Sequence, residues 1–341
     1  MSRSEMDKGG VRIARRSARS SGLSERVTAR LYLVGWAAVC RLPRSWMYWL
    51  FMRIADLLWR RRGKSVQRLE ANLRRVIGKD ASAEELRQLS KAGMRSYLRY
   101  WLEVFRLPAI PADEIMAKMR MTGDQEEVAL GHLAAGRGVI FALPHMGNYE
   151  QAGAWIVRRG AGSFTTVAER LNSTAVYDKF LEFRESLGME VLPHTGGGGP
   201  FERLAERLRE GRLVCLVCDR DLSRHGVEVQ FFGEEARMAA GPAALAVDTG
   251  AALMPVTLWF QGEDWGARIY PEIPVPAAGT RREKIAAMSQ ELAQVFEEGI
   301  SEHPEDWHML QKLFVADLDR RRLPKVGLDG SADVTQSTTT S

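Results

Sequence analysis

The pattern of apolar and polar positions from residue 115 onward alternates between two kinds of segment. Short apolar runs, typical of buried strands, come at 116–121, 138–143, 164–168, 189–192, 213–218, 227–232, 254–260 and 268–271. Segments with apolar residues at helical spacing separate them, at 124–135, 148–159, 173–187, 200–210, 239–249 and 282–300. Strands that alternate with helices indicate an α/β fold with a central, mostly parallel sheet flanked by helices.

The N-terminal part has a different pattern. Residues 66–106 have helical periodicity, whereas residues 24–62 interleave Trp, Leu and other apolar residues with arginines and predict two helices broken near Pro43. The longest run without a charge, Leu31–Cys40, is ten residues. A membrane-spanning helix needs about 20, so we do not expect this segment to cross a membrane.

Charge is distributed unevenly along the chain. Residues 1–64 carry a net charge of +11, and the remaining residues carry −6, within a total of +5. Helices rich in Trp and Arg suit the interface of an anionic membrane, where indole rings lie at headgroup level and arginines meet phosphates. The alternative is a pair of ordinary amphipathic helices packed on the core. Both readings remain open from the sequence alone.

Composition divides the chain into four segments. A basic arm rich in Arg, Ser and Gly (1–22) and a polar tail (325–341) are expected to be disordered. Between them we expect membrane-interfacial helices (23–64) and one α/β domain (65–324). Three cysteines make a disulfide framework unexpected, and the pair Cys215 and Cys218 lies in an apolar strand, so neither a metal site nor a redox site is predicted.

The segment FALPHMGNYE, residues 141–150, places a histidine at the end of a buried strand. Ligands and catalytic groups of open α/β sheets gather just past the carboxyl ends of strands. Asn148 is a candidate N-cap for the following helix, with Glu150 in its first turn. We expect Glu150 to hold one imidazole nitrogen of His145 and leave the other as a base. The alternative is a structural histidine bonded to backbone.

A second strand end carries further polar residues. Asp219, Arg220 and Asp221 follow the apolar run that starts at Leu213; we expect Asp219 to stabilise the imidazolium, with Asp221 as the alternative acid. No Gly-x-Ser-x-Gly motif appears in the sequence. If His145 is a base, the hydroxyl that it activates therefore belongs to a substrate.

Several motifs together resemble one family. PHMGNYE is similar to the motif of the glycerolipid acyltransferase superfamily in which four residues separate a His from an Asp or Glu. NLRRVIG, VAERL, FRESLGMEVLP, CDRDLSRHGVEVQFFGEEARMAAGP and GAALMPVTL resemble the branch that contains lipid A secondary acyltransferases and actinobacterial phosphatidylinositol mannoside acyltransferases. The resemblance covers residues 25–320, and the blocks 167–193 and 218–233 are closer to the mannoside-acylating enzymes.

The resemblance implies an O-acyltransferase with a glycerolipid acyltransferase-type fold. The donor would be acyl-CoA, as a co-substrate, and the acceptor a sugar hydroxyl of a membrane glycolipid, with no metal and no other cofactor. The enzyme would act peripherally at the cytoplasmic face of the inner or plasma membrane. By the same resemblance, Glu169 and Arg170 line the acceptor site, Arg184 contacts the donor or holds the site together, and Arg220 and Asp221 bind substrate. For Arg170 and Arg184, a surface salt bridge and a solvated helix face are the respective alternatives.

Three other functions remain open. Lipid A-type acylation would use acyl carrier protein as the donor. An esterase would use water as the acceptor. A nucleic-acid-binding protein would explain the basic arm but leave residues 141–150 and 218–233 unexplained, so we expect no nucleic-acid partner.

Overall fold

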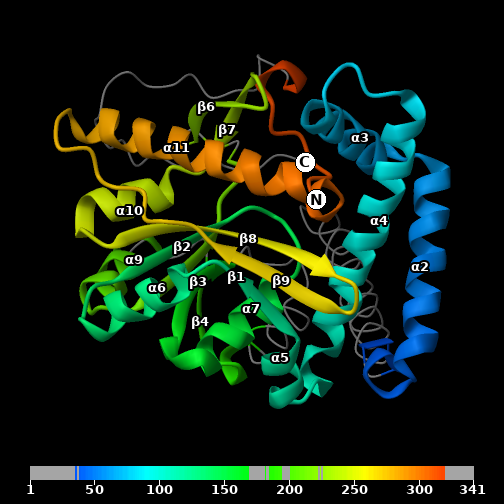
Figure 1. Cartoon of the computed structure of the whole chain (residues 1–341), viewed down its shortest axis with the longest axis horizontal. Coiled ribbons are helices and arrows are strands. Elements are labelled where there is room, and N and C mark those ends of the chain that lie inside the picture. Colours follow the sequence, from blue (N-terminus) through cyan, green and yellow to red (C-terminus); the bar gives the residue numbers. More distant parts are fainter. Residues whose placement is uncertain are drawn as a thin grey trace, which may run out of the picture.

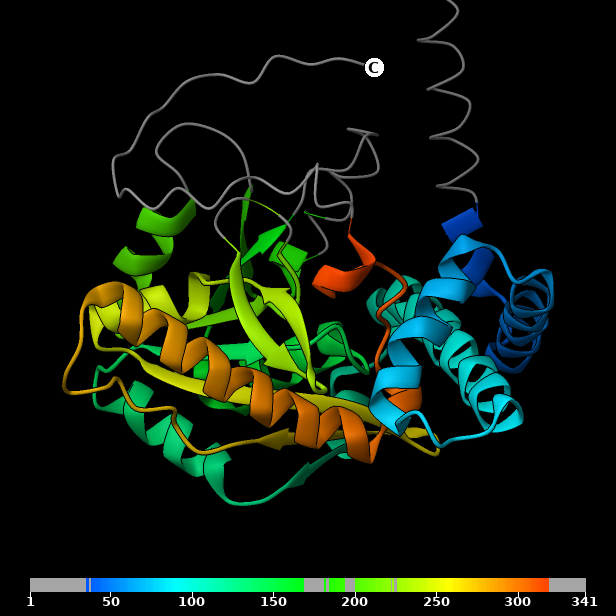
Figure 2. The ribbon, with the colours of Figure 1, turned by 90° about the horizontal axis from the view of Figure 1, so that it is seen from above.

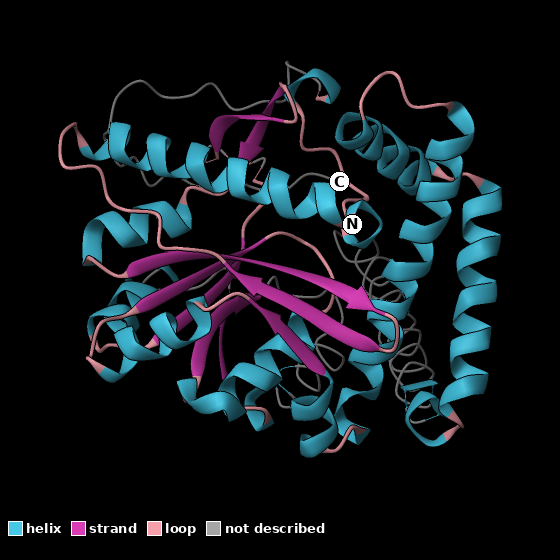
Figure 3. Ribbon diagram, viewed as in Figure 1, coloured by secondary structure: helices cyan, strands magenta, loops and turns pink. Residues whose placement is uncertain are grey.

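The fold is built around a seven-stranded sheet (Figures 1 and 3). The computed structural model describes residues 35–36, 38–168, 181, 184–193, 200–221, 223 and 226–318. The sheet has the order β1-β9-β8-β2-β5-β3-β4. Its strands are β1 (Met119–Thr122), β2 (Val139–Leu143), β3 (Phe164–Ala168), β4 (Met189–Pro193), β5 (Leu213–Val217), β8 (Ala252–Gln261) and β9 (Asp264–Ile269).

Strand β2 lies at the centre of the sheet. It pairs in parallel with β5 on one side and β8 on the other, and all five of its residues are buried. The only antiparallel pair among the described strands of this sheet is the β8–β9 hairpin. Continuous apolar runs are what a strand covered on both faces requires. The predicted α/β fold with a mostly parallel sheet is therefore confirmed.

Side chains of β2 alternate between two cores. Ile140 and Ala142 face a core covered by α9 (Pro200–Arg209), α10 (Gly241–Thr249) and α11 (Arg281–Glu302). Val139, Phe141 and Leu143 face the other core, covered by α5 (Ala112–Lys118), α6 (Gln125–Ala134) and α7 (Tyr149–Ile156). This alternation follows from the two-residue period of a strand. The result is a three-layer arrangement (Figure 1).

Three helices from the N-terminal part stand beside the sheet (Figure 2). They are α2 (Arg44–Arg61), α3 (Lys64–Ile77) and α4 (Ala83–Arg106). Pro43 is the N-cap of α2, and residues 38–41 before it are helical, so the predicted break is confirmed. Arg95 of α4 holds Asp56 of α2 through two hydrogen bonds of 2.7 and 2.8 Å. None of the helices described here combines the length and the apolar character needed to cross a membrane.

One strand of the structure lies in a segment for which the sequence pattern predicts no element. Residues Glu234–Met238 form β7, which pairs with β6 (Val227–Phe231) in a separate hairpin. The charged sequence of β7 gives no strand signal, but its residues 236–238 are buried. Phe232 and Gly233 make the turn with φ of 49° and 73°, a left-handed pair that matches the twist of two-residue hairpins. Helix α5 was not predicted and occupies the start of the predicted strand 116–121.

Short helical turns complete the described chain: η1 (Leu107–Ala109), η2 (Val157–Ala161), η3 (Pro304–Asp306) and η4 (Val315–Asp317). The predicted arm 1–22 and tail 325–341 lie outside the described residues, as does most of the predicted helix 173–187.

Candidate active site

The candidate site lies where β2 and β5 end side by side. Leu143 pairs with Val217 at the last register position of this parallel pair, and Cys218 N donates to Leu143 O at 2.8 Å. His145 and Asp219 each follow two residues beyond that position. Because parallel neighbours in register carry their chains past the same edge of the sheet, these two side chains are brought together.

His145 and Asp219 form a tight hydrogen-bonded pair. Imidazole Nδ1 lies 2.5 Å from Asp219 Oδ1, and the backbone N–H of His145 donates to Asp219 Oδ2 at 3.0 Å. Asp219 is fully buried, whereas 43% of the His145 side chain is exposed. The expected contact between Asp219 and His145 is present in the structure.

Each member of the pair shifts the pKa of the other. Burial alone would lower the pKa of His145, but the negative charge of Asp219 and their hydrogen bond outweigh burial and raise that pKa. Burial alone would raise the pKa of Asp219, but the imidazole and three hydrogen bonds to the carboxylate lower it. A proton shared in this way sits on Nδ1. Within the described chain no residue bonds Nε2, so this nitrogen is left to act on a substrate.

The turn that carries His145 is fixed by close backbone packing. Gly147 has φ of 56°, and a Cβ there would lie 2.6 Å from the backbone carbonyl of Leu258. Only glycine fits this position, since a side chain would both strain the backbone and collide with β8.

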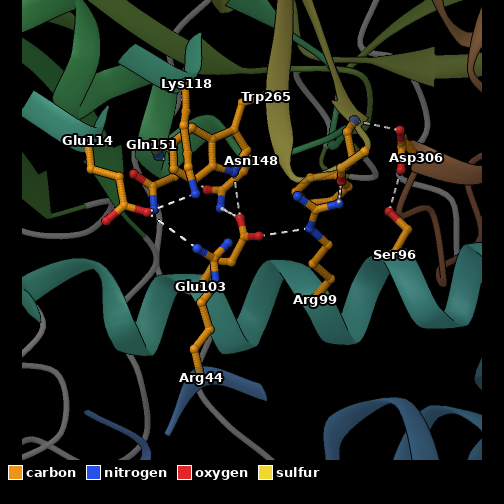
Figure 4. A network of polar contacts seen from close by, with 12 residues as sticks. Arg44, Ser96, Arg99, Glu103, Glu114, Lys118, Asn148, Gln151, Trp265 and Asp306 are labelled. Atoms are coloured by element: carbon orange, nitrogen blue, oxygen red, sulfur yellow. Dashed lines mark hydrogen bonds and ion pairs between the residues drawn. The ribbon is translucent and has the colours of Figure 1, made fainter. Parts of the chain in front are cut away.

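Asn148 then starts α7 and ties it to α4. Its Oδ1 accepts from Gln151 N at 3.1 Å, which confirms the predicted N-cap. Its Nδ2 donates to Glu103 Oε2 at 2.8 Å (Figure 4). Glu103 also accepts from Trp265 Nε1 and Arg99 Nε, at 2.7 and 2.8 Å. A buried carboxylate with three donors therefore holds the start of α7.

The expected hydrogen bond from Glu150 to the imidazole is not what the structure contains. Glu150 is 3% exposed and pairs with Arg184, whose Nε lies 3.2 Å from Oε2 and whose second guanidinium nitrogen contacts Oε1. Burial alone would lower the pKa of Arg184, but Glu150 more than offsets burial and raises it. Asp219 holds Nδ1 instead, because β5 brings Asp219 to that nitrogen whereas the first turn of α7 points Glu150 at Arg184.

The remaining predicted residues lie around this centre or outside the described chain. Arg220 Nε donates to Lys312 O at 2.8 Å, and its positive charge opposes that of the imidazolium. Asp221 Oδ1 accepts from Ser223 N at 2.7 Å in a local turn. Glu169 and Arg170 lie outside the described residues.

Sequence reasoning missed two residues that contact the site. Trp307 Nε1 donates to Asp219 Oδ2 at 3.0 Å, and Glu103 holds Asn148 as described above. Glu103 lies in a helix that also carries ordinary surface charges, so its sequence gave no signal. Trp307 lies in the segment DWHML, where a Trp-His pair without strand or helix pattern was the only hint.

No metal centre is evident in the described part of the chain, where no three His, Cys, Asp or Glu side chains gather as ligands would. Cys215 and Cys218 are free thiols, and burial raises the pKa of both. Protonated thiols in an apolar strand are poor metal ligands and poor nucleophiles.

Comparison with known proteins identifies similar sequences over most of the chain. The model of the family described as bacterial lipid A biosynthesis acyltransferase matches residues 15–315. A phosphatidylinositol mannoside acyltransferase of Mycolicibacterium smegmatis is 45% identical over 311 residues, which cover 89% of this chain and 97% of that protein. A phosphatidylinositol mannoside acyltransferase of Mycobacterium tuberculosis is 45% identical over 304 residues, which cover 89% of this chain and 93% of that protein.

Proposed function

This chain belongs to the bacterial lipid A biosynthesis acyltransferase family, and we propose that it transfers a fatty acyl chain from acyl-CoA to a mannose hydroxyl of a phosphatidylinositol mannoside. Acyl transfer to a glycolipid follows from the family and from relatives that share 45% of their residues with this chain. The choice of a mannosylated phosphatidylinositol follows the names of those relatives. The oxygen acceptor and the coenzyme A donor are part of the proposal.

In the proposed reaction, His145 Nε2 removes the proton from the acceptor hydroxyl as its oxygen attacks the thioester carbonyl. The tetrahedral intermediate then expels the coenzyme A thiolate, and the imidazolium returns the proton to it. One ester forms and one thioester breaks, with no acyl-enzyme. The observation that carries this proposal is the His145–Asp219 pair, because Asp219 fixes the proton on Nδ1 and stabilises the imidazolium formed midway.

We propose a supporting role for the pair Glu150 and Arg184. Both side chains are largely enclosed, with 3% and 14% of their surface exposed, and their ion pair anchors the first turn of α7 directly after the His145 turn. Within this proposal Arg220, Asp221 and the undescribed Glu169 and Arg170 contribute to substrate binding. Neither a metal nor a further cofactor takes part.

The proposed acceptor is a membrane lipid, so the enzyme must reach a lipid surface. Large exposed apolar side chains of the described chain gather on or just before α2: Leu42, Trp46, Tyr48, Trp49, Leu50, Ile54, Leu57 and Leu58; beyond that region only Val128 and Val275 are exposed. Arg53, Arg60 and Arg61 lie among them. We propose that this face contacts an anionic membrane, peripherally and on the cytoplasmic side, where acyl-CoA is available.

The proposal is tested by transfer from radiolabelled palmitoyl-CoA to purified phosphatidylinositol mannoside in lipid vesicles. We expect the wild type to label the glycolipid, and His145→Ala to lower the rate by a factor on the order of 10²–10⁴, as expected for a lost general base. His132→Ala is the matched control, because His132 lies on α6 before the opposite end of β2.

Each other outcome has a distinct meaning. Full transfer by His145→Ala would remove His145 as the base. Transfer from acyl carrier protein but not from coenzyme A would replace the donor, and labelling of a lipid A precursor instead would replace the acceptor. Free palmitate released at the full rate without glycolipid would identify an esterase.

A further inference from the structure

The turn that carries His145 is paired with a segment from the far end of the chain. Gly147 N donates to Asp306 O at 2.9 Å, and His308 N donates to His145 O at 2.7 Å. Between these two bonds, Met146 and Trp307 form an antiparallel bridge. Residues 306–308 therefore hold the backbone on both sides of the histidine, although they lie about 160 positions later in the sequence.

Trp307 also reaches the carboxylate that holds the imidazole. Its ring is fully buried, and its Nε1–H donates to Asp219 Oδ2 at 3.0 Å. The same Oδ2 accepts the backbone N–H of His145, which leaves Oδ1 for imidazole Nδ1. The three bonds engage both carboxylate oxygens, so a rotation of the carboxylate would break at least one of them.

The indole ring itself is held in place by the β6–β7 hairpin. Its centroid lies 5.9 Å from that of Phe231, with the planes at 80°, and 6.1 Å from that of Phe232. The contact with Phe231 is edge-to-face, an arrangement that favours a single ring orientation. The orientation of the Nε1–H is thus set by this aromatic packing as well as by the backbone bonds to the His145 turn.

We propose that Trp307 is a positioning residue for the acyl transfer reaction, which locks the plane of the Asp219 carboxylate so that Oδ1 faces Nδ1 and Nε2 faces the acceptor hydroxyl. This inference rests on the proposed function, because it assumes that His145 is the base. It adds a residue that does not touch the substrate. Its effect is transmitted through Asp219 to the basicity and the orientation of the imidazole.

The test is Trp307→Phe, which keeps an aromatic ring and removes the N–H donor. With one donor fewer, negative charge concentrates on Asp219, so the carboxylate holds the imidazole proton more tightly. We expect the acidic limb of the kcat/KM profile to move to higher pH, and kcat to fall by about 10- to 100-fold with KM for palmitoyl-CoA changed less than about twofold. Asp219→Asn should move the acidic limb to lower pH. In the double variant with Trp307→Phe, the limb should lie close to its position in Asp219→Asn alone.

Two controls separate positioning from folding. Trp59→Phe removes an indole bond of 3.0 Å to Ser90 Oγ, which joins α2 to α4 and does not involve Asp219, and should leave kcat and the pH profile unchanged. If Trp307→Phe does not fold, a benzothienylalanine incorporated at position 307 keeps the bicyclic shape without an N–H. The pH shift should then appear in a protein with wild-type thermal stability.

The outcomes for the two proposals are distinguishable. An unchanged kcat and pH profile for both variants at position 307, in an enzyme that His145→Ala inactivates, would overturn the role of Trp307 and leave the base intact. Activity of His145→Ala at the wild-type rate would overturn the base and the positioning role together.

Discussion

Asn148 ties α7 to α4: its Nδ2 donates to Oε2 of Glu103, 45 positions earlier in the chain, at 2.8 Å, while its Oδ1 caps α7. Both groups are buried. The side chain that starts the helix after His145 is thereby fixed to α4, the long helix that packs against the N-terminal α2. This bond links the catalytic edge of the sheet to the helices that we propose to contact the membrane.

Replacing Asn148 should therefore cost more than an ordinary helix cap. Asn148→Ala removes the cap and one of the three donors to buried Glu103, so we expect the free energy of unfolding to fall by about 2–4 kcal/mol. Ser82→Ala is the matched control, because Ser82 caps α4 at an exposed position and should cost only about 1 kcal/mol. Urea denaturation followed by circular dichroism measures both. Equal losses would show that the bond to Glu103 adds nothing.

Glu150→Gln tests whether the ion pair with Arg184 stabilises the fold without altering the pKa of His145. The substitution removes the carboxylate that pairs with the largely buried Arg184 guanidinium, and we expect the free energy of unfolding to fall by about 3–5 kcal/mol, as when one partner of a buried ion pair is removed. The acidic limb of the kcat/KM profile should stay in place, because Asp219 and not Glu150 bonds His145.

The control for Glu150→Gln is the double variant Glu150→Gln with Arg184→Met, which removes the buried guanidinium as well and should recover part of the stability. A shift of the acidic limb as large as that of Asp219→Asn would instead return Glu150 to the role of the imidazole partner.

Asp306 should make stability depend on pH in an unusual direction. Burial raises the pKa of this carboxyl to about 7 from the ordinary value of 3.8, despite hydrogen bonds from Ser96 Oγ and Phe260 N (Figure 4). Between about pH 4 and pH 7 the folded state holds a proton that the unfolded state has lost, so this group stabilises less as pH rises. Asp306→Asn cannot ionise and lacks this dependence.

The measurement for Asp306 is the free energy of unfolding of wild type and Asp306→Asn at pH 5 and pH 8. We expect the substitution to cost less at pH 8 than at pH 5, by about 1–3 kcal/mol, given about 1.4 kcal/mol for each pH unit. A cost that is equal at both pH values would place the pKa of Asp306 in its usual range.

The exposed face of α2 should govern membrane binding. Trp46 and Trp49 are 68% and 59% exposed, and we expect the double change to Ser to lower binding to vesicles that contain anionic lipid by about 10-fold or more, because two indole rings lose their place at the interface. Vesicle co-sedimentation measures the binding.

Val128→Ser together with Val275→Ser is the matched control for the tryptophan pair, since both valines are exposed but distant from α2 in the sequence. The thermal unfolding midpoint of the tryptophan variant should remain near that of the wild type. Unchanged vesicle binding by that variant would argue that α2 is simply a helix packed on α4.

The sequence by itself determined the α/β class, most strand positions and the break at Pro43, because these depend on local periodicity and on proline geometry. It also located His145 and Asp219, since an apolar strand followed by a polar residue is visible in the chain. The charged strand β7 was not predicted, because Ala236 and Met238 are buried in the core that α9, α10 and α11 cover, and the charged pattern of the strand does not indicate this burial.

Only the tertiary structure decided which acid holds the histidine. Glu150 is five residues from His145 and Asp219 is 74 residues away, yet the parallel register of β2 and β5 brings Asp219 to Nδ1 and the helical turn of α7 directs Glu150 to Arg184. Trp307 joins the site through the same kind of long-range contact. The order of the strands in the sheet and the return of the C-terminal segment to the His145 turn produce these contacts, and neither can be read from the spacing of residues along the chain.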